Sequence, residues 1–139
     1  MKITAKVDYA CHALVELGLH WPNREPLQIQ TIAKRQGIPL NFLTHILIGL
    51  KQSGCVESSR GKSGGYYLTK PPAEITLKDI ISNFGGSVGL FSYNHPGKRP
   101  MDIIWQDINK ELSKQMEGLT LATICERVKS QSKNLTYDI

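Results

Sequence analysis

The sequence predicts a mainly α-helical fold with one small β-hairpin. Apolar residues recur at helical spacing in several segments, and two short alternating segments over residues 55–70 enclose a Gly-rich loop. The segments follow the order helix, helix, helix, hairpin, and further helical segments come after them. The chain has 139 residues, of which 40% are hydrophobic and 21% charged, which is typical of a globular protein with a real core.

Three helices are predicted before the hairpin. Apolar residues over 4–21 approximate a 3.6-residue repeat, which predicts a helix of about five turns that the prolines of "PNREP" end. Residues 28–36 predict a short second helix that stops at Gly37. A third helix is predicted over 40–53 and is closed by Gly54. Its inward side chains are Leu43, Ile46, Leu47 and Leu50. A short helix, a Gly-containing turn and a longer helix are the helix-turn-helix pattern, and the alternative is a plain helical hairpin in an α-bundle.

The hairpin favours a winged helix-turn-helix domain. "CVESS" (55–59) and "GYYLTK" (65–70) predict two strands, and the glycines of "RGKSG" between them allow a tight turn. Arg60 and Lys62 would then lie at the tip of a wing, near a phosphate or a minor groove, since narrow minor grooves attract arginine. "GKSGG" also contains the Gly-Lys-Ser of a phosphate-binding loop. However, Val56 stands where that motif needs its first glycine, and a strand rather than a helix follows.

The second part of the chain predicts helices joined by a long loop. Thr76 and Asp79 predict a capping pair that opens a helix over 77–84. Residues 84–100 are rich in Gly and Pro and predict a loop, which is long for a connector. A long helix is predicted from Met101 to about Met116, and a last helix over 121–129 is followed by a polar, mobile tail.

One face of the long helix is apolar. We expect this face to pair with its copy in a second chain, and the alternative is that it folds back onto its own domain. The residues on the face are Met101, Ile104, Trp105, Ile108, Leu112 and Met116, of which Ile104, Trp105, Ile108 and Leu112 are expected in the dimer interface. The expected domains are 1–84 (winged helix-turn-helix), 85–100 (sensor-type loop), 101–130 (dimerisation helix and C-terminal helix) and 131–139 (flexible tail).

Charge and cysteine content narrow the class of protein. The formal net charge of +5 favours a polyanionic partner, although charge alone does not identify one. No apolar run is long enough to span a bilayer, and Asp8, His12 and Glu16 interrupt the apolar part of the N-terminal segment, so we expect a cytoplasmic protein. The cysteines Cys11, Cys55 and Cys125 are scattered and odd in number, which disfavours a disulfide framework, and Cys55 is most simply a small buried apolar residue.

Three stretches together resemble one family. They are "YACHALVELGLH", "IQTIAKRQGIPLNFLTHILIGLKQSGCVESSRGKSGGYYLTKPPAEITLKDII" and "IIWQDINKEL", which cover nearly the whole chain. This combination resembles the IscR/NsrR/CymR family of bacterial transcription regulators, the Rrf-two type. The resemblance implies a homodimer that binds partly palindromic promoter DNA, as a repressor or an activator.

The resemblance also implies DNA-binding residues. Asn41, Phe42, Thr44 and His45 fall where the recognition helix meets DNA: Asn can pair with adenine, His with guanine, and Thr and Phe can touch a thymine methyl. For Phe42 the alternative is core packing, and for His45 it is an exposed residue without a role. Arg60 matches the wing arginine of the minor groove, while Lys62, Ser63 and the backbone of Gly64 match phosphate contacts. Lys6 and Lys51 are further candidates for backbone contacts.

The sequence departs from the family at the sensor. Many members place three cysteines before the long helix, and these bind an iron–sulphur cluster, but residues 84–100 contain none. Arg99 takes the place of the last cysteine, and Asp102 stands where some members have a histidine.

A different ligand set is the alternative at the sensor. Asp8 and His12 lie four residues apart on one helix face, where some members draw cluster ligands, and thiolates are the usual remaining ligands. Cys11 lies on a different face, and His95 lies in the sensor loop. An iron–sulphur cluster bound through Asp8 and His12 and an exposed pair without metal both stay open.

The residues disfavour two other classes of function. A winged-helix protein–protein adaptor would present an acidic or apolar wing and recognition helix. The residues found there, Arg60, Lys62, Asn41 and His45, argue against this function. An enzyme is not expected, because the sequence contains no nucleophile–base–orienter set and no hydrolytic metal motif. The expected function is therefore that of a dimeric DNA-binding regulator. Its signal is either a redox or iron–sulphur change, or a small molecule or partner protein.

Overall fold

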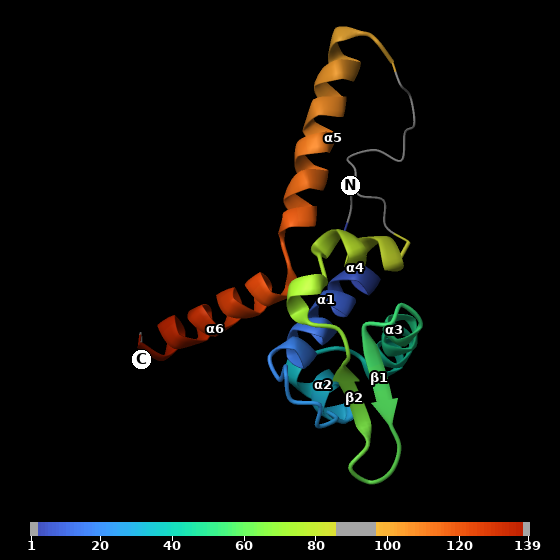
Figure 1. Ribbon diagram of the computed structural model, residues 1–139, viewed down its shortest axis with the longest axis vertical. Coiled ribbons are helices and arrows are strands. Elements are labelled where there is room, and N and C mark those ends of the chain that lie inside the picture. Colours follow the sequence, from blue (N-terminus) through green and yellow to red (C-terminus); the bar gives the residue numbers. More distant parts are fainter. Residues whose placement is uncertain (1–2, 86–96, 138–139) are drawn as a thin grey trace.

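The computed structural model describes residues 3–85 and 97–137. Figure 1 shows three helices followed by an antiparallel hairpin, then a short 3₁₀ helix and three more helices. In order these are α1 (Ala5–Gly18), α2 (Ile29–Gln36), α3 (Leu40–Gln52), β1 (Val56–Ser59), β2 (Gly65–Leu68), η1 (Pro72–Glu74), α4 (Leu77–Asn83), α5 (Pro100–Gly118) and α6 (Leu121–Tyr137). The predicted fold class, mainly α with a small hairpin in winged helix-turn-helix order, is confirmed.

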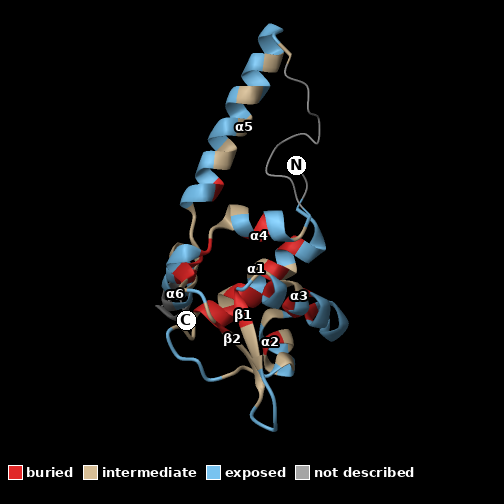
Figure 2. Ribbon diagram, turned by 45° about the vertical axis from the view of Figure 1, so that its right-hand side comes forward, coloured by how far each residue is buried: buried red, intermediate tan, exposed pale blue. Residues whose placement is uncertain are grey.

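Helix α1 is the element that most of the others pack against. It contacts α2, α3, α4, α6 and β2. Thr4 caps its start, since the Val7 backbone N–H donates to Thr4 Oγ1 at 3.2 Å. Ala10 and Ala13 are fully buried, and such small side chains let a neighbouring helix approach closely. The helix is therefore the centre of the core, in the middle of the red region of Figure 2.

Helices α2 and α3 form the predicted helix-turn-helix. Gly37 ends α2 in the left-handed conformation at φ 64°, where glycine carries no steric cost. The four inward residues predicted for α3 are all fully buried. Glu16 of α1 is buried as well, and its carboxylate accepts hydrogen bonds from Arg35 at 3.2 Å and Gln36 at 3.4 Å. This pairing ties the end of α2 to α1.

The wing, residues 55–70, is joined to the start of α2. Its strands pair from Val56 with Leu68 to Ser59 with Gly65. Leu27 and Tyr66 exchange two backbone hydrogen bonds, each 2.8 Å. The segment before α2 is therefore joined to β2 by an isolated antiparallel bridge. The sequence pattern did not predict this bridge.

Helix α4 begins as predicted, but the core extends further along the chain than expected. Thr76 and Asp79 form the full capping box of α4. Just before it, the Leu121 N–H donates to Ile75 O at 2.8 Å, which draws α6 back onto the first domain. Leu121 and Cys125 are buried in the main core, so the core is not confined to the expected domain 1–84.

The last helix is longer than predicted. We expected it to end at Lys129, with a flexible tail over 131–139, but α6 continues to Tyr137. The added residues include neither glycine nor proline, so nothing in the backbone stops the helix there. Residues 138–139 of the predicted tail lie outside the described part of the chain.

Helix α5 forms an arm that leads away from the core. Pro100 occupies its first turn, where a missing N–H costs nothing. The helix is largely exposed along its length in Figure 2. Among the described residues, its lower end packs on the first domain, where Met116 is buried with Val7 and Ile81. Within the described residues, no helix combines the length and apolarity that crossing a membrane requires.

Candidate nucleic-acid interface

The outward side of α3 presents the side chains predicted to meet bases. Asn41, Thr44 and His45 are all exposed, and their spacing of three and four residues places them on one face. The Thr44 hydroxyl donates to Leu40 O at 3.0 Å, so its oxygen keeps acceptor capacity. The face therefore offers an amide, a hydroxyl and an imidazole, which are groups suited to hydrogen-bonding base edges.

Phe42 lies beside this face and is not a core residue. Its side chain is 51% exposed, so the alternative of core packing is excluded. Its ring packs edge-on against Tyr9 of α1, with centroids 5.8 Å apart and planes at 64°. Tyr9 supports Phe42 from a helix distant in sequence, and neither residue type nor spacing could have predicted that contact.

The wing tip carries the predicted basic residues. Arg60, Lys62 and Ser63 are exposed, and Gly61 turns the chain at φ 107°. A Cβ at Gly65 would come within 2.1 Å of Leu27 O, so glycine is required where β2 meets the segment before α2. Gln28 also holds the tip, because its Nε2 donates to Lys62 O at 3.0 Å. The role of Gln28 was missed, since it depends on the unpredicted bridge at Leu27.

An open hollow of about 410 Å³ lies between the wing and the start of α2. It is lined by Gln28, Ile29, Gln30, Gly61, Gly64, Gly65 and Tyr66. Gln28 makes no side-chain capping bond to α2, so the first backbone N–H groups of the helix keep their donor capacity. Such N–H groups at a helix start favour an anion such as a phosphate.

Two lysines flank α3. Lys6 of α1 lies with its Nζ 5.9 Å from the ring centroid of Phe84. Lys51 at the end of α3 donates to Ser58 Oγ at 2.8 Å and pairs with Glu57 at 3.2 Å. The Ser58 N–H and then Lys51 hold the pKa of Glu57 below its usual range, so this carboxylate stays ionised. A phosphate contact from Lys51 would therefore compete with an existing ion pair.

The apolar face predicted for α5 divides into two parts. Met101, Ile104, Trp105 and Ile108, here called the apolar stripe, are each at least 39% exposed. Leu112 and Met116, further along, pack with Val7 and Ile81 of the same chain. The helix thus packs against its own domain at one end, while the stripe at the other end is partly exposed to solvent.

Comparison with known proteins identifies the family. Residues 3–127 match the Rrf2 family model, described as an iron-dependent transcriptional regulator. The chain belongs to the Rrf2 family.

Individual relatives agree with this assignment. An rrf2-like HTH-type transcriptional regulator of Rhodobacter capsulatus is 41% identical over 62% of this chain, and the match spans only 59% of that relative. The regulator IscR of Aliivibrio salmonicida is 32% identical over 89% of this chain and 77% of its own length. The structure of CymR, the global cysteine regulator of B. subtilis, superposes with a TM-score of 0.83 at 24% identity and covers 91% of this chain and 98% of its own. The protein is accordingly a transcriptional regulator with the winged-helix fold, and it is not an enzyme.

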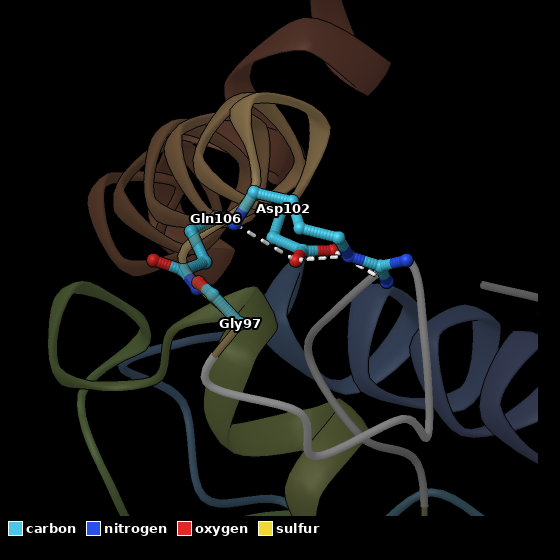
Figure 3. A network of polar contacts seen from close by, with 4 residues as sticks. Gly97, Asp102 and Gln106 are labelled. Carbon is cyan, nitrogen blue, oxygen red and sulfur yellow. Dashed lines mark hydrogen bonds and ion pairs between the residues drawn. The ribbon is translucent and has the colours of Figure 1, made fainter.

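The start of α5 holds Arg99 and Asp102, the two residues at which the sequence departs from the cluster-binding pattern that the family resemblance implies. Asp102 accepts from the Arg99 backbone N–H at 3.2 Å and from its side chain at 2.9 Å and 3.3 Å, and its own side chain is only 12% exposed. Gly97 packs so closely that a Cβ there would lie 2.1 Å from Asp102 Oδ2, and its carbonyl accepts from Gln106 at 3.1 Å (Figure 3). Arg99 and Asp102, which the resemblance aligned with ligand positions, thus form an ion pair with each other.

The remaining candidate ligands do not assemble into a cluster site within one chain. His12 Nε2 lies 3.3 Å from Asp8 Oδ1, as the spacing predicted, and both side chains are about half exposed. Among the described residues, no three His, Cys, Asp or Glu side chains gather as a metal site would require. His95 lies outside those residues. The described side chains of a single chain therefore do not fit an iron–sulphur cluster.

Burial disfavours the thiolate form of Cys11 and Cys125. Burial, and then the nearby charge of Asp8, raises the pKa of Cys11 to about 11. Burial also raises the pKa of Cys125, whose Sγ lies 3.8 Å from Val15 O, while Cys55 is buried as expected. A thiol is a far weaker metal ligand and nucleophile than a thiolate.

The reactivity of Cys11 is testable. At pH 8 we expect iodoacetamide to alkylate Cys11 roughly a hundredfold more slowly in the native chain than in the urea-unfolded chain, because the raised pKa keeps the thiol protonated. The rate should rise as the pH approaches 11. Peptide mapping by mass spectrometry separates Cys11 from Cys55 and Cys125. A native rate equal to the unfolded rate would contradict the raised pKa, and Asp8→Asn should speed the native reaction without reaching that rate.

Proposed function

We propose that this Rrf2 regulator binds partly palindromic promoter DNA as a cytoplasmic homodimer. The observation that carries the proposal is the exposed polar side of α3 beside a basic, Gly-rich wing. An α-helix of this kind fits the major groove, where each base pair presents a distinct set of donors and acceptors. The net charge of +5 supports binding to a polyanion but adds no sequence preference.

Each residue then has a separate role. Asn41 pairs with adenine, His45 with guanine, and Thr44 and Phe42 contact a thymine methyl. Arg60 enters the minor groove beside the major groove that α3 occupies. Lys62, Ser63 and the backbone of Gly64 bind phosphate, which orients the protein without reading sequence. Lys6 and Lys51 add phosphate contacts on either side of α3, and Lys51 does so by exchanging Glu57 for a phosphate.

The homodimer rests on the apolar stripe of α5. Four large apolar side chains exposed along one stretch of helix form a patch that soluble proteins usually cover. A second copy crossing this stripe would bury it and would place two α3 helices about a two-fold axis. A two-fold protein matches a two-fold operator, so the operator is expected to be a partial palindrome.

Variants of the wing test the DNA-binding proposal. Arg60→Ala should weaken binding to a selected operator by about 1–3 kcal/mol and relax preference at the bases under the wing. Lys62→Ala should instead weaken binding to every duplex and lower the slope of log affinity against log salt by about one. The measurement is a fluorescence anisotropy titration at several salt concentrations.

The matched control for these variants is Lys70→Ala. Lys70 is exposed like Arg60 and Lys62 but follows β2, at the end of the wing away from the tip. Lys70→Ala removes one positive charge, as Arg60→Ala and Lys62→Ala do, so a general electrostatic effect would lower the DNA affinity of all three variants alike. That result would count against a specific role for the wing tip.

Variants of α5 test the homodimer. Ile104→Glu should give a monomer, because it places a charge in the centre of the stripe that the partner covers. Ile103→Glu is the control: Ile103 is 49% exposed and Ile104 is 47% exposed, but Ile103 lies on the other side of the helix. Sedimentation of both variants should give a monomer for the first and a dimer for the second. A dimer in both would remove the stripe from the interface.

Control by a small molecule or partner protein is the form of regulation that we favour. The pairing of Arg99 with Asp102 supports it, because these positions already satisfy each other without a cluster. The second candidate is an iron–sulphur cluster shared between two chains. The contact between Asp8 and His12 supports that candidate.

One measurement separates the two candidates. Protein purified without oxygen should be colourless and free of iron and sulphide if regulation is cluster-free, and it should still bind promoter DNA. Visible absorption bands with iron and sulphide, lost in an Asp8→Ala/His12→Ala double variant, would instead establish the shared cluster.

A further inference from the structure

Helix α3 carries one exposed apolar residue in the middle of its outward side. A helix turns about 100° per residue, which places Asn41, Thr44, His45, Ile48 and Gln52 along one continuous face, here called the outward face of α3. All five are exposed, and Ile48 is 46% exposed. Ile48 lies four residues after Thr44 and three after His45, so its side chain is their neighbour on the surface.

Contacts at both edges of α3 show that Ile48 points away from the protein. On the wing edge, Lys51 holds Ser58 and Glu57 of β1. On the opposite edge, Phe42 packs on Tyr9, and a Cβ at Gly49 would come within 3.1 Å of the Phe84 ring. Ile48 lies between these edges.

A single exposed isoleucine does not by itself indicate a function, since single apolar residues are common on protein surfaces. Ile48 differs because its neighbours on the face are polar and because the face as a whole is the part of α3 left for a partner. An isolated side chain of this kind is too small to be a protein-docking patch. In the major groove, however, one base-edge group calls for an apolar contact, and that group is the C5 methyl of thymine.

We propose that Ile48 is a specificity-determining residue that contacts a thymine methyl in the operator. This inference rests on the proposed DNA-binding function and extends it to a residue outside the polar set. Ile48 lies two turns beyond Asn41 on α3, so its thymine is expected further along the groove than the base that Asn41 contacts. Burial of the methyl against Ile48 would favour thymine over each of the other bases.

A coupling experiment tests this proposal. Duplexes that bind wild-type protein are first selected from a random library, and each thymine of the chosen site is then replaced singly by deoxyuridine, which lacks only the methyl. At the thymine that Ile48 contacts in each half-site, wild-type protein should lose about fourfold in affinity, the effect expected for one buried methyl. This thymine is separate from the one assigned to Thr44 and Phe42. Ile48→Ala should bind more weakly but should show no further loss with deoxyuridine at that position.

Thr44→Ser is the matched control, because it removes the other methyl group on the same face. It should leave the deoxyuridine effect at the Ile48 position unchanged. If the effect vanishes in Thr44→Ser but persists in Ile48→Ala, Thr44 is the contact and the proposal for Ile48 is overturned. Because Ile48 is exposed, its substitution should leave the thermal unfolding temperature unaltered, and Ile48→Val offers a milder change should the alanine variant fail to fold.

Failure of the proposal can be distinguished from failure of the proposed function. Selection of a defined site by wild-type protein, with the same preferences and deoxyuridine effects in Ile48→Ala, would overturn the role of Ile48 and leave DNA recognition standing. If wild-type protein selects no sequence at any salt concentration, both fall together.

Discussion

The buried face of α3 is the constraint on which the proposed binding surface depends. Leu43, Ile46, Leu47 and Leu50 are all fully buried, which holds α3 at one rotation against α1. Since a helix has a constant turn per residue, the inward residues decide which residues face outward. A substitution on this buried face, or at Ala10 or Ala13 of α1, would therefore rotate or shift the outward face of α3 without changing any residue on it. The chemistry of the surface is set by Asn41, Thr44, His45 and Ile48, but its geometry is set from inside.

The wing is positioned by backbone rather than by side chains. The bridge between Leu27 and Tyr66 fastens β2 to the segment before α2, and Gln28 adds a bond to the tip. A β-hairpin alone is only marginally stable, so these bonds give the wing a fixed direction beside α3. Gly65 is required because Leu27 O lies where a Cβ would be. The glycines that suggested a tight turn therefore also allow the close approach of another segment, which joins the wing and α2 into one surface.

Local signals predicted most of the elements, while distant contacts were predicted poorly. Some signals act within one or two helical turns, and the sequence therefore predicts them directly. They are the capping pair Thr76 and Asp79, the helix end at Gly37 and the inward residues of α3. The bridge between Leu27 and Tyr66, and the one that joins Thr76 to Thr120 at the start of α6, are single pairings between distant segments. A single pairing produces no periodic pattern in the sequence. Leu121 and Cys125 lie in the core because the pairing at the start of α6 draws that helix back onto the first domain. Helix α6 continues to Tyr137 because its sequence contains no residue that would end a helix. At the site, the sequence indicated the polar and basic residues but not Tyr9, Gln28 or Ile48, whose roles depend on neighbours from other elements.

If the proposed homodimer forms, the α5 arm gives a route for a signal to reach DNA without a cluster. Helix α5 is attached to the first domain through Met116 and through an ion pair between Lys78 of α4 and Glu117. Its far end is closed by Arg99 and Asp102, and the apolar stripe lies between the two ends. A partner helix on that stripe would relate two α3 helices, so a ligand that changes the crossing of the arms would change the distance between the two recognition helices. Half-site spacing is strict in two-fold DNA recognition, and a small change at the arms is therefore sufficient to alter affinity. Because Arg99 and Asp102 already pair with each other at the start of α5, the proposed dimer interface, rather than a metal site, is where we expect the signal to act.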